Sequence, residues 1–380
     1  CLPALTLKSY SFEILPNEVE KLIHLRLLDL SGCLAIKDLP ETICNLCNLQ
    51  NLNISGCRKI TKLPQGMWKL IKLRHLLTCW AVLSPKGIGR LSSLRTLDTF
   101  VIGGIDDIDG CKLGELKNLN RLKGSLMIKG LKNVTDVQEA ENAQLKEKKH
   151  LRELRLSFDK EVEEIESVRN DEIVLKALEP HPNLEILTIV YCMGRVYPNW
   201  MKSLYNLKRL ELLTWPNLEQ LPPLGQLRFL ETLELEDVYS VKKVGVEFLG
   251  IEEANGKNGS TSPLVLFPNL KSLQFWDMKE CEECDGMGER REEEGESGDS
   301  VLISIMPRLQ FLHIWRCPKL KALPNFVKGI ECRLWNFQLD DVGIQFIRIE
   351  NTLSRSEWRR RAFAPFGEAA VARIIRDMGW

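Results

Sequence analysis

The sequence predicts an α/β solenoid, in which a parallel β-sheet lines the concave side and irregular or short helical segments form the convex side. Residues of the leucine type recur with the spacing L-x-x-L-x-L at eleven places, and the shorter separations between successive copies are 21 to 24 residues. Several copies also close with Leu-Pro, a pair that suits a return turn because proline lacks a backbone donor. The chain is therefore expected to be a stack of similar units.

Each copy predicts one short strand whose aliphatic residues face the core while the residues between them face outward. The copies begin at Leu2, Leu25, Leu49, Leu73, Leu94, Leu151, Leu184, Leu207, Leu230, Leu270 and Leu309. A twelfth, irregular copy has Leu126 and Ile128 as its strand residues. A single unit cannot bury its apolar face, so neighbouring units must stack. Spacing of this kind is typical of a leucine-rich repeat horseshoe, which we predict for residues 1–327 with about 11 to 12 repeats.

Three segments interrupt or follow this pattern. Residues 250–263 and 279–299 are polar and highly charged, so we expect variable, mobile loops there. From residue 328 the repeat pattern ends. We interpret residues 328–380 as a non-repeat tail of unknown role: a gene-model artefact, a truncation scar or a private extension.

Composition restricts the function classes. Lysine plus arginine and aspartate plus glutamate both number 52, so no basic footprint for nucleic acid is present. No apolar run is long enough to span a membrane, and no signal peptide is visible. Because the chain begins inside the repeat pattern, we expect a fragment of a longer protein. Twelve cysteines without a pairing pattern favour the reducing cytoplasm.

No catalytic or metal-binding constellation is found in the sequence. The phosphate loop G-x-x-x-x-G-K-[ST] and the nucleophile motif G-x-S-x-G are absent, and the five histidines lie in separate units. Four cysteines, Cys33, Cys57, Cys192 and Cys317, each follow the first leucine of their unit by eight residues. This position takes a packing residue in leucine-rich repeats. We therefore predict a chain that is not an enzyme and that holds no cofactor and no metal.

The candidate binding residues lie between the strand leucines, where side chains face the concave surface without contributing to the core. Aromatic residues and arginine dominate the energetics of protein interfaces, and they gather in the last repeats. We predict a protein-binding surface made of Tyr191, Arg209, Glu211, Glu234, Trp276, Phe311, His313, Trp315 and Arg316. In the early repeats we expect Asp29, Ser31, Asn53 and Ser55 to face outward, where a partner can reach them.

The run "VIGGIDDIDGCKLGELKNLNRLKGSLMIKGLKNVTDVQEAENAQLKEKKHLRELRLSFD", together with "YPNWM", "LEQLPPLGQLRFLETLEL" and "MPRLQFLHIWRCPKLKALP", resembles the leucine-rich repeat region of plant coiled-coil, nucleotide-binding, leucine-rich repeat (NLR) disease resistance proteins. This resemblance implies a cytoplasmic module of innate immunity that recognises a pathogen effector or a guarded host protein. It also implies that the early repeats pack on a nucleotide-binding domain of the full-length protein and restrain it.

Two rival interpretations remain open. One is the ligand-binding ectodomain of an extracellular leucine-rich repeat receptor, and the other is the substrate adaptor of a ubiquitin ligase.

Overall fold

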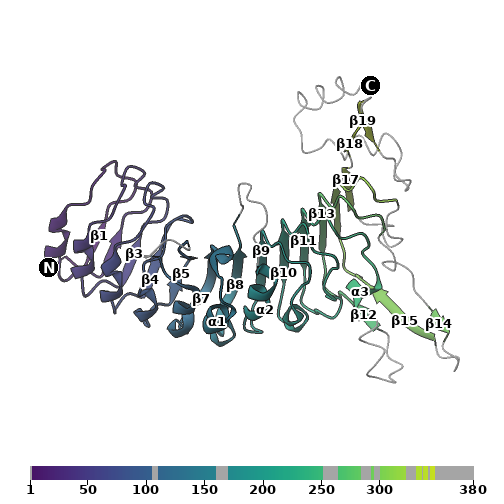
Figure 1. Ribbon diagram of the computed structural model, residues 1–380, viewed down its shortest axis with the longest axis horizontal. Coiled ribbons are helices and arrows are strands. Elements are labelled where there is room, and N and C mark those ends of the chain that lie inside the picture. Colours follow the sequence, from purple (N-terminus) through teal and green to yellow (C-terminus); the bar gives the residue numbers. More distant parts are fainter. Residues whose placement is uncertain are drawn as a thin grey trace. The chain divides into compact units, whose positions relative to one another are not determined.

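The computed structural model of the protein describes residues 2–104, 110–159, 170–250, 264–283, 292–294, 300–321, 331–335, 337–340 and 343–346. The chain divides into two compact units. Unit 1 comprises Cys1–Gly194 with Pro198–Leu207, and unit 2 comprises Arg195–Tyr197 with Lys208–Trp380. Both units consist of short strands joined by turns, loops and brief helices (Figure 1).

Strands in unit 1 occur at the places that the leucine spacing predicts. They are β1 (Ala4–Thr6), β2 (Leu27–Asp29), β3 (Asn51–Asn53), β4 (His75–Leu77), β5 (Thr96–Leu97), β6 (Thr99–Val101), β7 (Lys123–Lys129), β8 (His150–Ser157) and β9 (Ile186–Val190). The first five form one parallel sheet in chain order, and β6 to β9 pair in parallel with one another. The irregular copy at Leu126 is β7, so its prediction is confirmed.

The parallel register aligns the strand leucines in columns. Leu28, Leu52 and Leu76 are direct partners on adjacent strands, and all three are fully buried or nearly so. Burying one leucine side chain contributes about 1.5–3 kcal/mol. Leu28, Leu52 and Leu76 each lie between apolar partners of the two neighbouring strands, so the core is continuous along this sheet.

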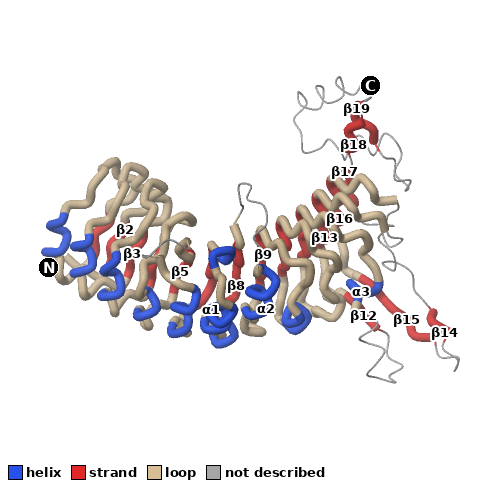
Figure 2. The backbone as a smooth tube through the Cα atoms, in the orientation of Figure 1, coloured by secondary structure: helices blue, strands red, loops and turns tan. Residues whose placement is uncertain are grey.

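Most connections in unit 1 contain a short helix, mostly of the 3-10 type, and these helices lie along one side of the strands (Figure 2). Pro16, Pro40 and Pro64 immediately precede the first three, where the missing backbone donor costs nothing. The helices are η1 (Asn17–Lys21), η2 (Glu41–Asn45), η3 (Gln65–Lys69), η4 (Ile88–Arg90), η5 (Leu113–Asn118), η6 (Leu131–Asn133), α1 (Val137–Asn142), η7 (Leu145–Glu147), α2 (Asp171–Ala177) and η8 (Asn199–Ser203).

Unit 2 repeats the same arrangement. Its sheet contains β10 (Arg209–Leu213), β11 (Thr232–Glu236), β13 (Ser272–Trp276), β16 (Phe311–Trp315) and β17 (Glu331–Trp335), all parallel and paired in this order. Buried Leu210, Leu233, Leu273 and Leu312 align across the first four strands. The remaining elements are α3 (Val246–Leu249), a sheet of β12 (Leu264–Leu266), β15 (Ser300–Ile305) and β14 (Glu292–Glu294), and the hairpin of β18 (Phe337–Asp340) and β19 (Gly343–Phe346).

Two boundaries differ from the sequence prediction. The loop expected over 279–299 starts later, because Glu283 forms a parallel β-bridge with Lys243 and Cys281 is buried within the repeat. Within the same range, Glu292–Glu294 forms a strand. Strand β17 lies in the expected non-repeat tail and extends the parallel sheet by one position. Residues 251–263 and 347–380 lie outside the described residues. Within the described ranges no helix is long and apolar enough to cross a membrane.

Candidate functional site

The cysteines of the repeats form a ladder of side chain to backbone hydrogen bonds rather than a reactive site. The thiols of Cys33, Cys57 and Cys79 donate to the carbonyl oxygens of Leu7, Leu30 and Ile54, at 2.8, 3.0 and 3.6 Å. Each acceptor belongs to the preceding repeat. Burial raises the pKa of Cys57 to about 11, so its thiol is not ionised at neutral pH and is a poor nucleophile. The predicted packing role of Cys33 and Cys57 is confirmed.

Alkylation tests this assignment. In the native chain at pH 8, iodoacetamide is expected to label the exposed Cys47 and to leave Cys33 and Cys57 unmodified. In guanidinium chloride all three should react at similar rates. Fragment-ion mass spectrometry locates the label, since Cys47 and Cys57 share a tryptic peptide. Native labelling of Cys57 as fast as Cys47 would contradict the ladder.

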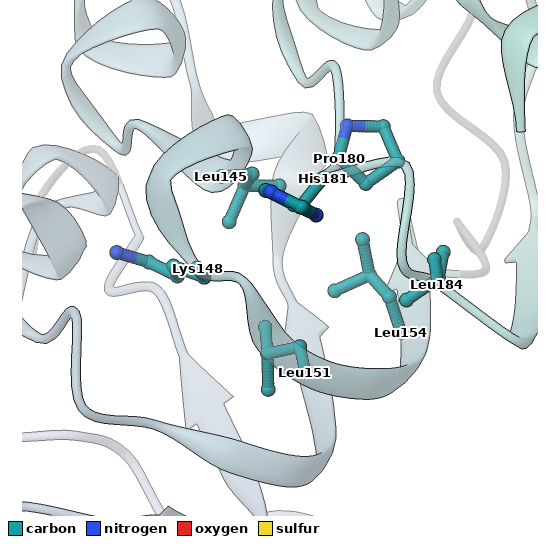
Figure 3. Close-up of a pocket in the computed structure, with 7 residues that line it drawn as sticks. All are labelled: Leu145, Lys148, Leu151, Leu154, Pro180, His181 and Leu184. Carbon is teal, nitrogen blue, oxygen red and sulfur yellow. The ribbon is translucent and has the colours of Figure 1, made fainter.

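A crevice in unit 1 contains a buried lysine, Lys148, but the crevice offers no space for a ligand. Figure 3 shows the residues that line it. Leu145, Leu151, Leu154, Pro180, His181 and Leu184 line it with Lys148, and it is too narrow for a water molecule. The amino group of Lys148 points away from Leu154 and Leu184 and donates to Leu116 O at 2.7 Å and Asn120 Oδ1 at 3.1 Å. Burial lowers the pKa of Lys148 to about 8. The buried lysine thus joins two turns of adjacent repeats.

Metal binding also finds no support in the geometry. Among the described residues, no group of three or more histidine, cysteine, aspartate or glutamate side chains is arranged to hold a metal ion. The sequence contains a C-x-x-C pair, Cys281 and Cys284, a spacing found in zinc sites. Cys281 is buried, and Cys284 lies outside the described residues.

The outward position expected for Asp29 is wrong. Asp29 is only 9% exposed, and its carboxylate accepts a hydrogen bond from Ser31 N at 3.0 Å and pairs with Lys8 at 3.2 Å. Burial raises the pKa of Asp29, but these contacts outweigh it and leave the pKa below its usual value. Asn53 similarly accepts from the backbone and hydroxyl groups of Ser55. Both side chains therefore stabilise the turn after the strand.

The strongest candidate surface is the outward side of the unit 2 sheet, which we call the open face. Side chains on β10, β11, β13 and β16 alternate between buried and partly or fully exposed positions. The register places the exposed ones in three rows across the strands. The rows are Arg209, Thr232, Ser272 and Phe311; Glu211, Glu234, Gln274 and His313; and Leu213, Glu236, Trp276 and Trp315.

An aromatic pair occupies the β13 and β16 end of the open face. The rings of Trp276 and Trp315 have centroids 5.7 Å apart and an interplanar angle of 30°. Trp276 Nε1 donates to Gln274 Oε1 at 3.3 Å, which fixes the orientation of this ring. Both indoles are partly exposed, and Phe311, at the other end of β16, is 38% exposed. Partly exposed, oriented indoles are the residue type that contributes most to protein interfaces.

Carboxylates occupy the β10 and β11 end. Burial and the negative charges of Glu211 and Glu236 raise the pKa of Glu234. Burial, together with Asp237 and Asp277, raises the pKa of Glu236. Each of these groups therefore destabilises its neighbours when ionised. The open face thus has an acidic end and an aromatic end.

Replacing Glu234 with glutamine is expected to stabilise unit 2 at pH 7. Because the pKa of Glu234 is raised in the folded state, the fold is more stable with this carboxyl group protonated. That stabilisation is lost as the pH rises through the raised pKa. Removing like charges on adjacent strands should raise the free energy of unfolding by about 0.2–1 kcal/mol. Urea unfolding at pH 7 and pH 4 measures this gain, which should shrink at pH 4. Exposed Glu219→Gln is the control, and a less stable Glu234→Gln at pH 7 would contradict the argument.

Of the nine predicted binding residues, eight belong to unit 2. Tyr191 follows β9 in unit 1, so it is not part of the open face. Arg316 follows β16 in a left-handed conformation (φ 52°), and its guanidinium lies 3.6 Å from Asp277. The prediction omitted Asp237 and Asp277, which occupy the same left-handed position after β11 and β13. The sequence signal for these two residues was an aspartate directly after each strand pattern, a position at which aspartate tolerates the left-handed conformation.

The chain is similar to known proteins over most of its length. Residues 113–238 match the family R13L1/DRL21 LRRs. RGA1 of Solanum bulbocastanum, named as a putative disease resistance protein, is 44% identical over 280 residues, which are 73% of this chain and 26% of RGA1. Disease resistance protein RGA2 of the same species is 35% identical over 198 residues, or 50% of this chain and 19% of RGA2. The chain thus spans about a quarter or less of these relatives.

A solved leucine-rich repeat protein of Leptospira interrogans shares 17% identity, with a TM-score of 0.39, over 80% of this chain and 76% of that one.

Proposed function

Since the chain is a leucine-rich repeat solenoid related in sequence to plant disease resistance proteins, we propose that it is the non-catalytic recognition module of a plant immune receptor. Its partner is a pathogen effector or a host protein that the receptor guards. The observation that carries this proposal is the oriented pair of Trp276 and Trp315 on the open face. All nine cysteines whose side chains the structure describes are free thiols, which supports the proposal that the chain acts in the reducing cytoplasm.

We further propose that unit 1 contributes autoregulation by contacting a nucleotide-binding domain of the full-length receptor. A cation stands at the start of four strands of unit 1: Arg26 directly before β2, Arg74 before β4, Arg95 before β5, and Lys123 as the first residue of β7. None of the four forms an ion pair within the described residues. Backbone hydrogen bonds link Arg74 to Arg95 and Arg95 to Lys123 on successive repeats. Burial and the charges of these last three cations lower the pKa of His75. Such a basic row suits an acidic domain surface.

A binding screen tests the recognition role. The chain is screened in yeast against secreted proteins of plant pathogens and against host proteins, and each confirmed interaction is measured again with purified proteins. Trp276→Ala with Trp315→Ala is expected to weaken binding at least tenfold while the circular dichroism stays unchanged. Trp80→Ala removes an indole of unit 1 that is 66% exposed and serves as the matched control. Full binding by the double variant to every confirmed partner, or ATP hydrolysis by the purified chain, would overturn the proposal.

Charge reversal tests the autoregulatory role. Arg74→Glu with Arg95→Glu should reduce co-precipitation of the chain with the nucleotide-binding domain proposed for its full-length receptor several-fold, whereas Arg58→Glu should leave it unchanged. An equal yield from all three proteins would contradict the contact.

A further inference from the structure

Strand β11 presents two carboxylates, Glu234 and Glu236, on the open face that form no ion pair in the part of the chain that the structure describes. Neither Glu234 nor Glu236 forms a hydrogen bond or an ion pair through its side chain within the described residues. Because the two residues are separated by one position on the same strand, their side chains lie on the same face about 7 Å apart. Both groups are partly exposed, so a ligand from solution can reach them.

The neighbouring cations already have their own partners. Arg209 NH1 lies 3.4 Å from Glu211 Oε1, and Arg316 pairs with Asp277. The charge of Arg209 also acts on Glu234, but burial and the two neighbouring glutamates outweigh it and leave the pKa of Glu234 raised. Lys279 Nζ lies 4.0 Å from the centre of the Tyr239 ring. The open face and its edge thus carry excess negative charge around β11.

Asp237 adds to this excess, because it is held by hydroxyl groups and not by a cation. Tyr239 OH donates to Asp237 Oδ1 at 2.8 Å, and Thr214 Oγ1 donates to Oδ2 at 3.3 Å. Burial, the hydrogen bond to Asp237 and the nearby carboxylates raise the pKa of Tyr239 to about 12, so the phenol remains a neutral donor. These hydrogen bonds orient the carboxylate without neutralising it.

The indole of Trp276 lies directly beside these carboxylates. Glu236 is the register partner of Trp276, and Trp276 is the register partner of Trp315. Adjacent strands are about 4.8 Å apart, so a planar cation above this row can contact a carboxylate and an indole at once. A guanidinium group suits both, since it stacks on aromatic faces and binds carboxylates through two parallel hydrogen bonds.

We infer that the open face of unit 2 binds its protein partner through an arginine side chain seated against Glu234, Glu236 and Trp276. This inference rests on the proposed recognition role and specifies the chemistry of the partner as a segment that carries exposed arginine. The charge complementarity of the face selects such a segment, and the aromatic end supplies the apolar contact area. Lysine fits less well because an ammonium group cannot form the two parallel hydrogen bonds.

Synthetic peptides test the inference with the full chain. The probe is Ac-GRGRGRG-NH2, and matched peptides replace arginine with lysine or with citrulline, which keeps the planar group and loses the charge. Calorimetry at 50 mM NaCl should detect the arginine peptide, several-fold weaker binding of the lysine peptide and no binding of the citrulline peptide. Glu234→Gln with Glu236→Gln should weaken arginine binding at least tenfold. Glu219→Gln with Glu247→Gln removes two exposed carboxylates elsewhere in unit 2 and should leave binding unchanged.

Three outcomes would overturn the inference. The first is equal affinity of the wild-type chain and Glu234→Gln with Glu236→Gln for the arginine peptide. The second is a wild-type chain that does not bind the arginine peptide but binds Ca²⁺, and loses the Ca²⁺ when Glu234 and Glu236 are replaced with glutamine. The third is a protein partner whose binding requires Trp276 and Trp315 but is unaffected by the glutamine variant; this outcome leaves the proposed function intact. Peptide binding without any protein partner would instead count against the proposed function alone.

Discussion

Leu52→Asp is expected to abolish cooperative folding of the sheet formed by β1 to β5. Leu52 is 1% exposed and pairs in register with Leu28 on one side and Leu76 on the other. The substitution removes a buried side chain worth about 2–5 kcal/mol and places a carboxylate in an apolar column at a further cost of several kcal/mol. This sum is comparable to the whole stability of a typical domain, about 5–15 kcal/mol. Circular dichroism and urea unfolding measure the loss.

Asn51→Asp is the matched control, because it adds the same charge to the same strand at a partly exposed position. It should leave the urea transition within about 0.5 kcal/mol of the wild-type chain. A cooperative transition of Leu52→Asp at the wild-type midpoint would show that neighbouring repeats do not share this column.

Lys148→Met is expected to remove a distinctive rise in stability at alkaline pH. The lysine has a pKa of about 8 in the folded chain and an ordinary value of 10.5. Between these values the unfolded chain binds more protons than the folded one, so stability increases with pH. The difference corresponds to on the order of 3 kcal/mol. Urea unfolding at intervals from pH 7 to pH 10.5 should show this increase in the wild-type chain relative to the variant.

The comparison between the two proteins isolates the lysine. Buried thiols and Tyr239 have raised pKa values, so they lower the stability of both proteins as the pH rises. They cancel in the difference. Identical pH dependence of the wild-type chain and Lys148→Met would mean that the lysine is protonated throughout this range in the folded state.

The strands that carry the leucine spacing were predictable from the sequence, because the spacing reports directly which side chains must be buried together. Even the irregular copy at Leu126 and Ile128 folds as the strand β7. The turn at Asp29 was not predictable in the same way. Alternation alone places Asp29 on the outside, and only the positions of Ser31 and Lys8 reveal why its carboxylate is buried. Spacing determines the face of a residue, whereas local hydrogen bonds determine its exposure.

The composition of the candidate surface was partly predictable. Trp276 and Trp315 follow from the alternation, but their contact depends on β13 and β16 being neighbours although the two tryptophans are 39 positions apart in the chain. The acidic character of β11 required the register across β10, β11 and β13, since the charges that act on Glu234 come from two strands. Strand β17 was missed because its sequence lacks the leucine spacing.

The cysteine ladder has a consequence for how such a chain changes in length. Cys57 and Cys79 each bind the preceding repeat through a thiol and a backbone carbonyl, a group that every repeat possesses. If the 24 residues 34–57 were duplicated in tandem, the copied Cys57 would meet the carbonyl of Ile54, and the copied Ile54 would offer its own carbonyl to Cys79. Unequal recombination within the gene can thus add or delete whole repeats while the core and its hydrogen bonds stay complete.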